Sequence, residues 1–355
     1  MKRSLDSIIR DEMLYNGYVT LDYFLYLASE HYYQFCNSIG EHGDFITAPS
    51  STQLFGETIA IWCVKKWLDS GSRTLNLIEL GPGDGYLMQD LLRSTSHVPG
   101  FHESIRQVLL VENSELLAGK QSMSLKGYQN LSIKWMKELR LADLNSTQGN
   151  FTILIANEFF DALPIKQFVY DGQSRFSEVV VTLKDDKLSL ARLAPTVLEN
   201  FDRINKFKEG AVFEYSPTAL LYAGEISAVL KSAGGSGLII DYGYTNSPGL
   251  STIQSLKGHS KNDFLCNIGE SDITSLVNFQ ALQSVFRKSS FICNLDTQRN
   301  FLIQHGILER LEYFLKNPKF SLEQKKQLKK HAELLIARDK MGDHFKILEV
   351  NIAND

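Results

Sequence analysis

The stretch Leu77-Ile-Glu79-Leu-Gly81-Pro-Gly83-Asp-Gly85 joins two segments of different periodicity. It closes the apolar run 75–80, and residues 86–93 follow it with apolar side chains on one helical face. Glycines at alternate positions let the backbone turn tightly and approach a ligand, because they carry no Cβ. The stretch therefore predicts a strand, a ligand-binding turn and a helix, the repeating unit of a doubly wound α/β fold.

The glycine spacing and the neighbouring acid bear on which ligand this turn binds. A dinucleotide site favours G-x-G-x-x-G, so that the pyrophosphate meets the amino terminus of the helix. Here the pattern is G-x-G-x-G, and Glu79 lies within the end of the preceding strand. A carboxylate there suits a cationic ligand, and S-adenosylmethionine carries a sulfonium and an ammonium group but no phosphate. The turn therefore favours S-adenosylmethionine over NAD, and a plain tight turn without a ligand is the alternative.

Apolar strands and helices alternate on both sides of this turn. Fully apolar strands of this kind indicate a parallel sheet that is covered by helices on both faces. The sequence therefore predicts an α/β, doubly wound (Rossmann-like) core. The expected elements are strands over 107–112, 131–135, 151–157, 211–215 and 237–241, with helices over 115–125 and 217–231.

Other segments depart from this alternation. Residues 4–39 predict two helices that Gly17 separates, whereas residues 168–193 alternate with period two and predict an antiparallel hairpin inserted into the sheet order. Residues 242–269 have no sustained period and predict a long functional loop. The remaining expected elements are a helix capped by Ser271-Asp272 that runs to Val285, a helix opened by a Ser321-x-x-Gln324 capping box that runs to Asp339, and a strand over 345–350.

These elements divide the chain into four regions. The regions are an amino-terminal helical region with a cofactor lid (1–70), the first half of the core (71–164), an inserted antiparallel substructure (165–210), and the second half of the core (211–355) with the long loop 242–270.

The composition limits the classes of function. The chain has 355 residues, of which 43% are hydrophobic and 22% are charged, as in an ordinary globular protein. A net charge of −4 offers no broad basic surface, so we expect no nucleic-acid partner. The cysteines Cys36, Cys63, Cys266 and Cys293 are scattered singly, which predicts free thiols and no metal site. No apolar leader or run of ~20 apolar residues occurs, so we expect a cytoplasmic protein without membrane insertion.

Polar residues follow two further strands at the edge where ligands of doubly wound folds bind. Glu112 ends the strand 107–112, where its carboxylate can accept hydrogen bonds from the ribose hydroxyls of a cofactor. Asn157, Glu158 and Asp161 follow the strand 151–157 and bring two acids and an amide to the same edge. The alternative for Asp161 is that it caps a helical turn.

Several motifs lie along nearly the whole chain. They are Gly43-Asp-Phe-Ile-Thr47-Ala-Pro49, Gln53-Leu-Phe55-Gly-Glu57, Glu79-Leu-Gly-Pro-Gly83, Ala156-Asn-Glu-Phe-Phe-Asp-Ala-Leu-Pro164, Ile240-Asp-Tyr-Gly-Tyr244, Gly269-Glu-Ser-Asp-Ile-Thr274 and Met341-Gly342. Together they resemble the MidA-like methyltransferases, which include the mitochondrial assembly factor that methylates an arginine of respiratory complex I. The chain departs from the family pattern at Ser50-Ser51, where relatives carry an acid, and at Asp84, where an arginine is common.

The resemblance implies a seven-stranded methyltransferase sheet, S-adenosyl-L-methionine as cofactor, and a protein substrate, with a respiratory NADH:quinone oxidoreductase subunit as the candidate. Residues 43–56 are expected to cover the cofactor as a lid. An NAD-dependent oxidoreductase and a non-catalytic assembly factor that retains the cofactor pocket are the alternative functions. The resulting candidates are Glu158 and Asp161 for catalysis, Thr47, Gln53, Glu79, Gly81, Gly83, Gly85, Glu112 and Asn157 for cofactor binding, and Asp241, Tyr242 and His259 as secondary residues.

Overall fold

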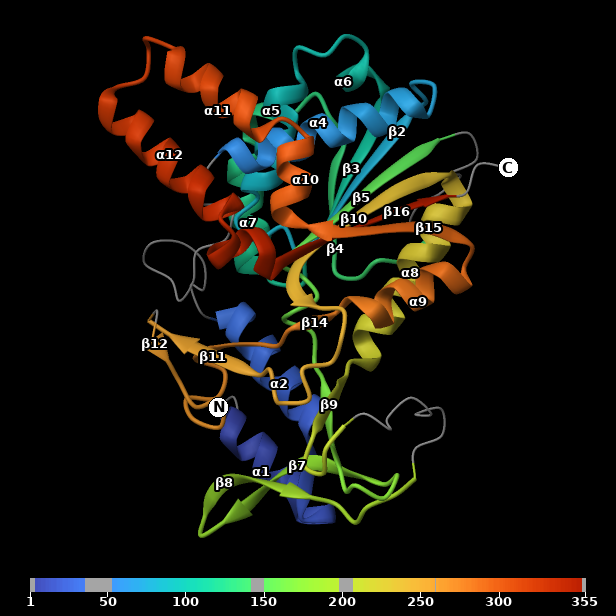
Figure 1. The fold of residues 1–355 in the computed structure, drawn as a ribbon, viewed down its shortest axis with the longest axis vertical. Helices are drawn as coiled ribbons and strands as arrows, with labels where there is room; N and C mark the ends of the chain where they lie inside the picture. The colour runs from blue at the N-terminus through green and yellow to red at the C-terminus, as the bar shows by residue number, and fades with distance from the viewer. Residues whose placement is uncertain (1–3, 36–52, 142–149, 198–206, 259, 353–355) are drawn as a thin grey trace.

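The computed structural model describes residues 4–35, 53–141, 150–197, 207–258 and 260–352. Figure 1 shows a large twisted sheet with helices on both faces, and below it a smaller sheet that packs against the amino-terminal helices. The helical hairpin of α11 and α12 projects from the side of the large sheet. The expected α/β architecture with an added antiparallel substructure is therefore confirmed.

The large sheet contains seven strands on its main path, as the family resemblance implies. Every neighbouring pair among β10, β5, β2, β3 and β4 is parallel. β16 runs antiparallel to both of its neighbours. In spatial order the strands are β15 (Phe291–Thr297), β16 (Phe345–Ile352), β10 (Gly235–Tyr244), β5 (Phe151–Asn157), β2 (Leu75–Leu80), β3 (Ile105–Val111) and β4 (Ile133–Met136).

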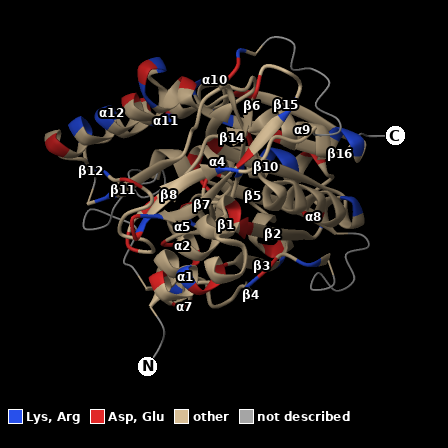
Figure 2. Cartoon of the chain, turned by 90° about the horizontal axis from the view of Figure 1, so that it is seen from below, with Lys and Arg blue, Asp and Glu red and all other residues tan. Residues whose placement is uncertain are grey.

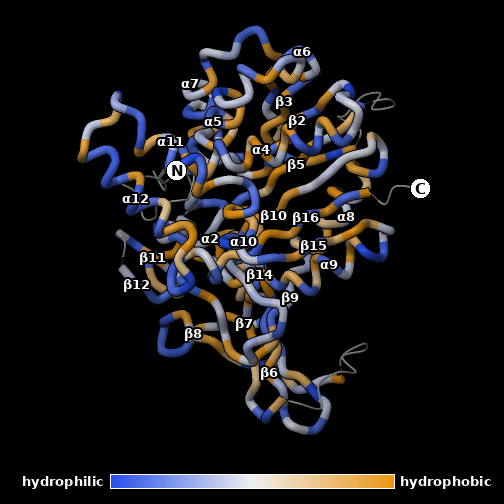
Figure 3. The backbone as a smooth tube through the Cα atoms, turned by 45° about the horizontal axis from the view of Figure 1, so that its top comes forward, coloured by the Kyte–Doolittle hydropathy of each residue, from blue (hydrophilic) through white to orange (hydrophobic). Residues whose placement is uncertain are grey.

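Alternate side chains of these strands enter two separate hydrophobic cores. Leu77 belongs to the core on one face, whereas Ile78 belongs to the core on the other. Figure 3 shows that hydrophobic residues concentrate along the central strands. The first face is covered by α4 (Gln53–Asp69), α5 (Tyr86–Thr95), α10 (Gln298–Gln304), α11 (Ile307–Lys316) and α12 (Leu322–Ile336), and the second by α8 (Pro217–Ala233) and α9 (Phe279–Lys288).

The expected antiparallel hairpin belongs to a second sheet and is not inserted into the large one. The antiparallel pairing itself is confirmed, because β7 and β8 form the hairpin. The prediction that 211–215 resumes the parallel sheet was wrong, because β9 pairs antiparallel with β6. Glu214 and the exposed Tyr215 explain the difference, since a strand covered on both faces would be apolar throughout. The sheet contains β1 (Tyr18–Thr20), β7 (Phe176–Lys184), β6 (Lys166–Tyr170) and β9 (Val212–Tyr215), with β8 (Lys187–Arg192) on β7.

The helix expected from Ser271 to Val285 begins later, at Phe279. Asn278 caps it by accepting a hydrogen bond from the Ala281 amide at 3.1 Å. The residues before it are extended because they pair with part of the expected loop 242–270. The small strands involved are β11 (Gln254–Lys257), β12 (Ser260–Lys261), β13 (Asp272–Thr274) and β14 (Val277–Asn278).

Local capping sets the ends of several helices. The capping box of α12 is confirmed, because the side chains of Ser321 and Gln324 each accept a hydrogen bond from the other's backbone N–H. Gly17, with a left-handed φ of 74°, ends α1 (Leu5–Asn16) before α2 (Leu21–Phe35) begins.

The helices carry charged residues on their surfaces. Figure 2 shows acidic and basic residues interspersed on α11 and α12. Among the described helices, none combines the length and apolar character needed to cross a membrane.

Candidate active site

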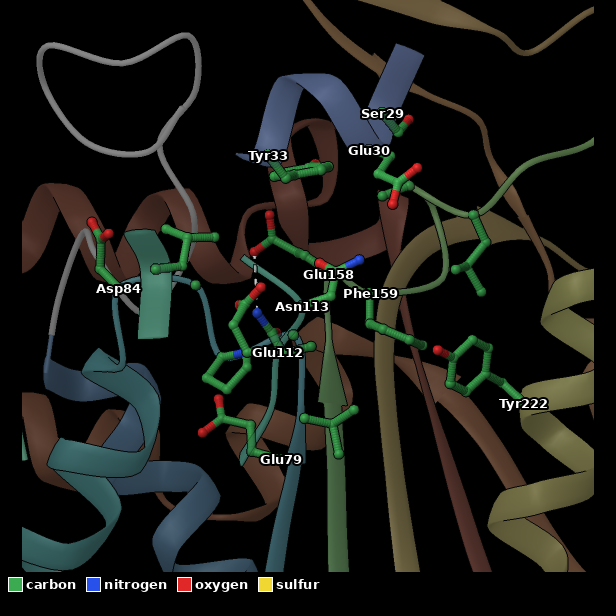
Figure 4. Close-up of a pocket in the computed structure, with 18 of the residues that line it drawn as sticks. Ser29, Glu30, Tyr33, Glu79, Asp84, Glu112, Asn113, Glu158, Phe159 and Tyr222 are labelled. Carbon is green, nitrogen blue, oxygen red and sulfur yellow. Dashed lines mark hydrogen bonds between the residues drawn. The ribbon is translucent and has the colours of Figure 1, made fainter. Parts of the chain in front are cut away.

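A pocket of about 270 Å³ lies at the carboxyl ends of β2, β3 and β5, between the large sheet and α2 (Figure 4). The sheet order reverses beside β2, which has β3 on one side and β5 on the other. Ligands of doubly wound folds bind at such a reversal. Among the described residues that line this pocket, five are acidic and none is basic; the acids are Glu30, Glu79, Asp84, Glu112 and Glu158.

The glycine turn forms the floor of the pocket. Gly81 and Gly83 both line it and have left-handed φ angles of 60° and 55°. A Cβ on Gly81 would lie 3.0 Å from the ring of Phe159. Gly85 does not line the pocket, since it faces α7 (Glu115–Ser124), where a Cβ would lie 3.1 Å from the Cα of Gln121. Two glycines therefore shape the binding surface, and the third allows close helix packing.

Glu79 lies under this turn at the end of β2. Its side chain is 2% exposed, and its Oε2 atom has no hydrogen-bond partner among the residues that the structure describes. Burial raises the pKa of Glu79 to about 8, because the charged form loses its hydration there. An orphaned carboxylate of this kind requires a cationic or hydrogen-bond-donating ligand.

Glu112 follows β3 and, unlike Glu79, is held by the protein. Its carboxylate accepts hydrogen bonds from the Ser114 amide at 2.9 Å and from the Gln121 side chain at 3.1 Å. The same Gln121 amide group donates to the Gly83 carbonyl at 2.8 Å. Burial raises the pKa of Glu112, although these hydrogen bonds oppose the shift. Glu112 is therefore oriented toward the pocket beside the glycine turn.

The departure from the family pattern at Asp84 has a local partner. The Asp84 carboxylate forms a 3.0 Å ion pair with Lys120, and Ser124 donates to the Asp84 carbonyl at 2.9 Å. This pair ties the glycine turn to α7. The other departure, Ser50-Ser51, lies outside the described residues.

Asn157 and Glu158 form the wall at the end of β5. Asn157 is 8% exposed, and its Nδ2 donates to Glu158 at 3.4 Å. Within the described part of the chain, its Oδ1 atom has no hydrogen-bond partner. Glu158 has a left-handed φ of 49°, which is uncommon for a residue with a side chain. Figure 4 shows its carboxylate directed toward Tyr33 of α2.

Asp241 holds this strained turn in place. Its carboxylate is fully buried and accepts hydrogen bonds from the amides of Phe160, Asp161 and Tyr242 at 3.0, 3.1 and 2.9 Å. Burial raises the pKa of Asp161 to about 6, although a hydrogen bond from Tyr242 lowers it. Burial and the neighbouring charge of Asp161 also hold the pKa of Asp241 well above its usual range. Asp161 is not among the residues that line the pocket, although its neighbour Ala162 is, so its catalytic role stays a prediction.

The structure brings most of the predicted site residues together. Glu79, Gly81, Gly83, Glu112, Asn157 and Glu158 line one pocket. Gln53 does not line the pocket and begins α4. Thr47, His259 and most of the expected lid 43–56 lie outside the described residues.

The sequence interpretation missed the contribution of the helices. Two helices also line the pocket: α2 with Tyr26, Ser29, Glu30 and Tyr33, and α8 with Tyr222. The polar side chains at positions 29, 30 and 33 share one face of the helix, but nothing in the sequence indicates that this face covers the strand ends.

Comparison with known proteins identifies the class that this fold and pocket define. Residues 58–297 match a family model described as S-adenosyl-L-methionine-dependent methyltransferase. The chain is 31% identical over 344 residues to "Protein arginine methyltransferase NDUFAF7, mitochondrial" of Xenopus tropicalis, covering 90% of this chain and 78% of the relative. The human protein of the same name is 30% identical, covering 88% of this chain and 75% of its own length. The chain therefore belongs to the family of S-adenosyl-L-methionine-dependent methyltransferases.

A solved structure has the same fold. A Burkholderia thailandensis protein bound to S-adenosyl-homocysteine superposes with a TM-score of 0.83 at 21% identity, covering 98% of this chain and 91% of that chain. The family assigns S-adenosyl-L-methionine as cofactor and disfavours the alternative of an NAD-dependent oxidoreductase. The residues fit this cofactor, because the buried carboxyl of Glu79 suits a cationic group and Glu112 offers hydrogen-bond acceptors at the adjacent strand end.

Proposed function

We propose that this methyltransferase modifies an arginine of a partner protein and that Glu158 is the principal ligand of the acceptor. The observation that carries the proposal is the position of Glu158. It lines the cofactor pocket beside the unpartnered Oδ1 of Asn157, on a strained turn that Asp241 holds in place. Strained backbone is retained where it positions a functional group.

The acceptor side of the reaction needs alignment and a place for a proton. Bound S-adenosylmethionine supplies an electrophilic methyl group. A carboxylate at position 158 binds a guanidinium through charge-assisted hydrogen bonds and orients one nitrogen toward the cofactor end of the pocket. The nitrogen that gains the methyl group loses a proton, and Glu158 is placed to receive it.

The names of the relatives support an arginine acceptor. The proteins from Xenopus tropicalis and human are both called protein arginine methyltransferases. We propose a subunit of a respiratory NADH:quinone oxidoreductase as the first substrate to test, because the motifs resemble a family with a complex I assembly factor. The compartment stays a prediction, since the sequence favoured the cytoplasm whereas these relatives are named mitochondrial. Fractionation of cells that produce the full chain with a carboxyl-terminal tag tests it.

The direct test combines methyl transfer with cofactor binding. The purified protein is incubated with isotopically labelled S-adenosylmethionine and purified oxidoreductase subunits, and the labelled residue is located by mass spectrometry. Glu158→Gln keeps the shape and removes the charge, so transfer should fall by about two orders of magnitude, the scale of losing ~3 kcal/mol of oriented charge pairing. Cofactor affinity should change less than about threefold. Label on lysine, or full activity in Glu158→Gln, would contradict the arginine assignment.

A further inference from the structure

The pocket has a second carboxylate on the wall opposite Glu158. Glu30 lies on α2 and lines the pocket together with Tyr26. Gln34 donates a 3.3 Å hydrogen bond to Glu30. Figure 4 shows Glu30 above the strand ends, on the side from which α2 covers the pocket.

The other pocket acids already have a role on the cofactor side. Glu79 lies under the glycine turn, Glu112 ends the neighbouring strand, and Asp84 pairs with Lys120. Glu30 and Glu158 are the remaining acids among the described lining residues. The orphaned Oδ1 of Asn157, in a side chain only 8% exposed, independently indicates that a hydrogen-bond donor binds at this wall.

Two further acids lie at the edge of the same pocket. Burial, a hydrogen bond with Glu30 and the charge of Glu138 raise the pKa of Tyr26. Burial and the charges of Glu225 and Glu138 likewise raise the pKa of Tyr222 on α8. Glu225 lies three residues after Tyr222 on one face of α8, and Leu139, the residue after Glu138, belongs to the core cluster against which Tyr222 packs, so both acids lie beside the pocket wall. We call Glu138 and Glu225 the acidic rim.

Glu138 of the acidic rim has an exposed cationic partner. Arg140 donates to Glu138 at 2.5 Å, in a pair whose side chains are 67% and 60% exposed. Exposed pairs of this kind contribute little to stability, so a cationic ligand can replace Arg140 as the partner of Glu138.

We propose that Glu30 and Glu158 bind the acceptor guanidinium from opposite walls and that the acidic rim selects an arginine flanked by basic residues. This inference rests on the proposed function and adds a substrate class to it. The guanidinium presents donors along more than one edge, so two carboxylates can bind it at once. Basic residues beside the arginine would be attracted by the negative charge of the rim, which would raise the affinity for the peptide, mainly at low ionic strength.

Binding of two synthetic peptides to the complex of the full chain with S-adenosylhomocysteine tests the rim. Both peptides carry one arginine, flanked by lysines in one and by serines in the other. Calorimetry should show about tenfold tighter binding of the lysine peptide, and the difference should shrink at about 0.5 M salt. The double change Glu138→Lys and Glu225→Lys should remove the preference, whereas Arg140→Gln should strengthen it.

Glu30 is tested with the same peptides. Glu30→Gln should weaken both by about tenfold without changing cofactor affinity, and Glu30→Asp should restore part of the loss. Glu312→Lys on α11, a helix with interspersed charges (Figure 2), is the control and should leave all affinities unchanged. Equal binding of the two peptides by the wild type, or unchanged affinity in Glu30→Gln, would overturn the inference. Methyl transfer is recorded separately, so peptide binding without arginine methylation would instead contradict the proposed function.

Discussion

The two halves of the pocket are built in different ways. The half that we propose binds the cofactor consists of the ends of β2 and β3, where Leu80 pairs with Val111. We call it the cofactor half, and the proposed binding region of the methyl acceptor the acceptor half. The acceptor half combines α2, α8 and the turn after β5, which lie far apart in the sequence. Sheet register thus determines the cofactor half, whereas helix packing determines the acceptor half. The two halves should therefore respond separately to substitution.

The largest effect is expected from the glycine turn. Gly83→Val places a β-branched side chain at a left-handed φ of 55° on the pocket surface. Cofactor affinity should fall by at least about a hundredfold, on the order of 3 kcal/mol. Gly119→Val on α7, where a Cβ has open space, is the matched control and should bind the cofactor normally. Normal binding by Gly83→Val would place the cofactor elsewhere.

The orphaned carboxylate should produce the next largest effect. Glu79→Gln removes a carboxyl group that a bound cation would hold in its charged form, so calorimetric affinity for S-adenosylmethionine at pH 8 should fall about thirtyfold, or ~2 kcal/mol. The rate of methyl transfer at saturating cofactor should stay within about threefold of wild type. A rate loss without an affinity loss would move Glu79 to the acceptor half.

The same substitution should stabilise the protein without cofactor as pH rises. The pKa of Glu79 is raised from 4.5 to about 8, so the folded protein binds this proton more tightly than the unfolded chain does. The carboxyl therefore lowers the free energy of unfolding progressively between these pH values. Glu79→Gln should raise the Tm by about 5 °C at pH 8 and have little effect at pH 4. Equal Tm values at pH 8 would show that Glu79 has a partner in solution.

Asp241 should affect the acceptor half more than the cofactor half. The carboxylate oxygens of Asp241 accept the hydrogen bonds that hold the turn of residues 158–161. Asp241→Asn replaces one of these oxygens by an NH₂ group, which cannot accept a hydrogen bond. Methyl transfer should fall about tenfold, while cofactor affinity changes less than about threefold. Steady-state kinetics and calorimetry measure the two quantities. An equal loss in both would mean that Asp241 supports the whole pocket.

The smallest effect is expected at Glu112. Glu112→Gln keeps an oxygen for a ribose hydroxyl and removes only charge assistance, so cofactor affinity should fall about fivefold, or ~1 kcal/mol. The contrast with Glu79 follows from their surroundings, because Ser114 and Gln121 already hydrogen-bond to Glu112. A loss as large as that of Glu79→Gln would remove this distinction.

The sequence predicted the large sheet well because its strands carry a strong local signal. Leu75–Leu80 and Phe151–Asn157 are fully buried, and the structure has both with the expected bounds. The strand 211–215 was placed in the wrong sheet because its partner, β6, is chosen by tertiary packing. The expected start of α9 at Ser271 was wrong for a similar reason, since pairing with β11 keeps Asp272–Thr274 extended.

The same reasoning explains which site residues were predicted. Glu79, Glu112 and Glu158 follow strands of one parallel sheet, so their meeting at one edge could be inferred from sequence. The position of Glu30 could not be inferred from sequence, because nothing local indicates that α2 packs over that edge. Asp161 follows the same strand as Glu158, yet it does not line the pocket, and its backbone amide donates to Asp241.

The most direct test of the two-part pocket measures cofactor affinity and the single-turnover rate of methyl transfer in Glu79→Gln and Glu158→Gln side by side. The account predicts opposite patterns. Glu79→Gln should lose about thirtyfold in affinity and keep its rate, whereas Glu158→Gln should keep its affinity and lose about a hundredfold in rate. Parallel losses of affinity and rate in both variants would contradict the separation of cofactor and acceptor halves.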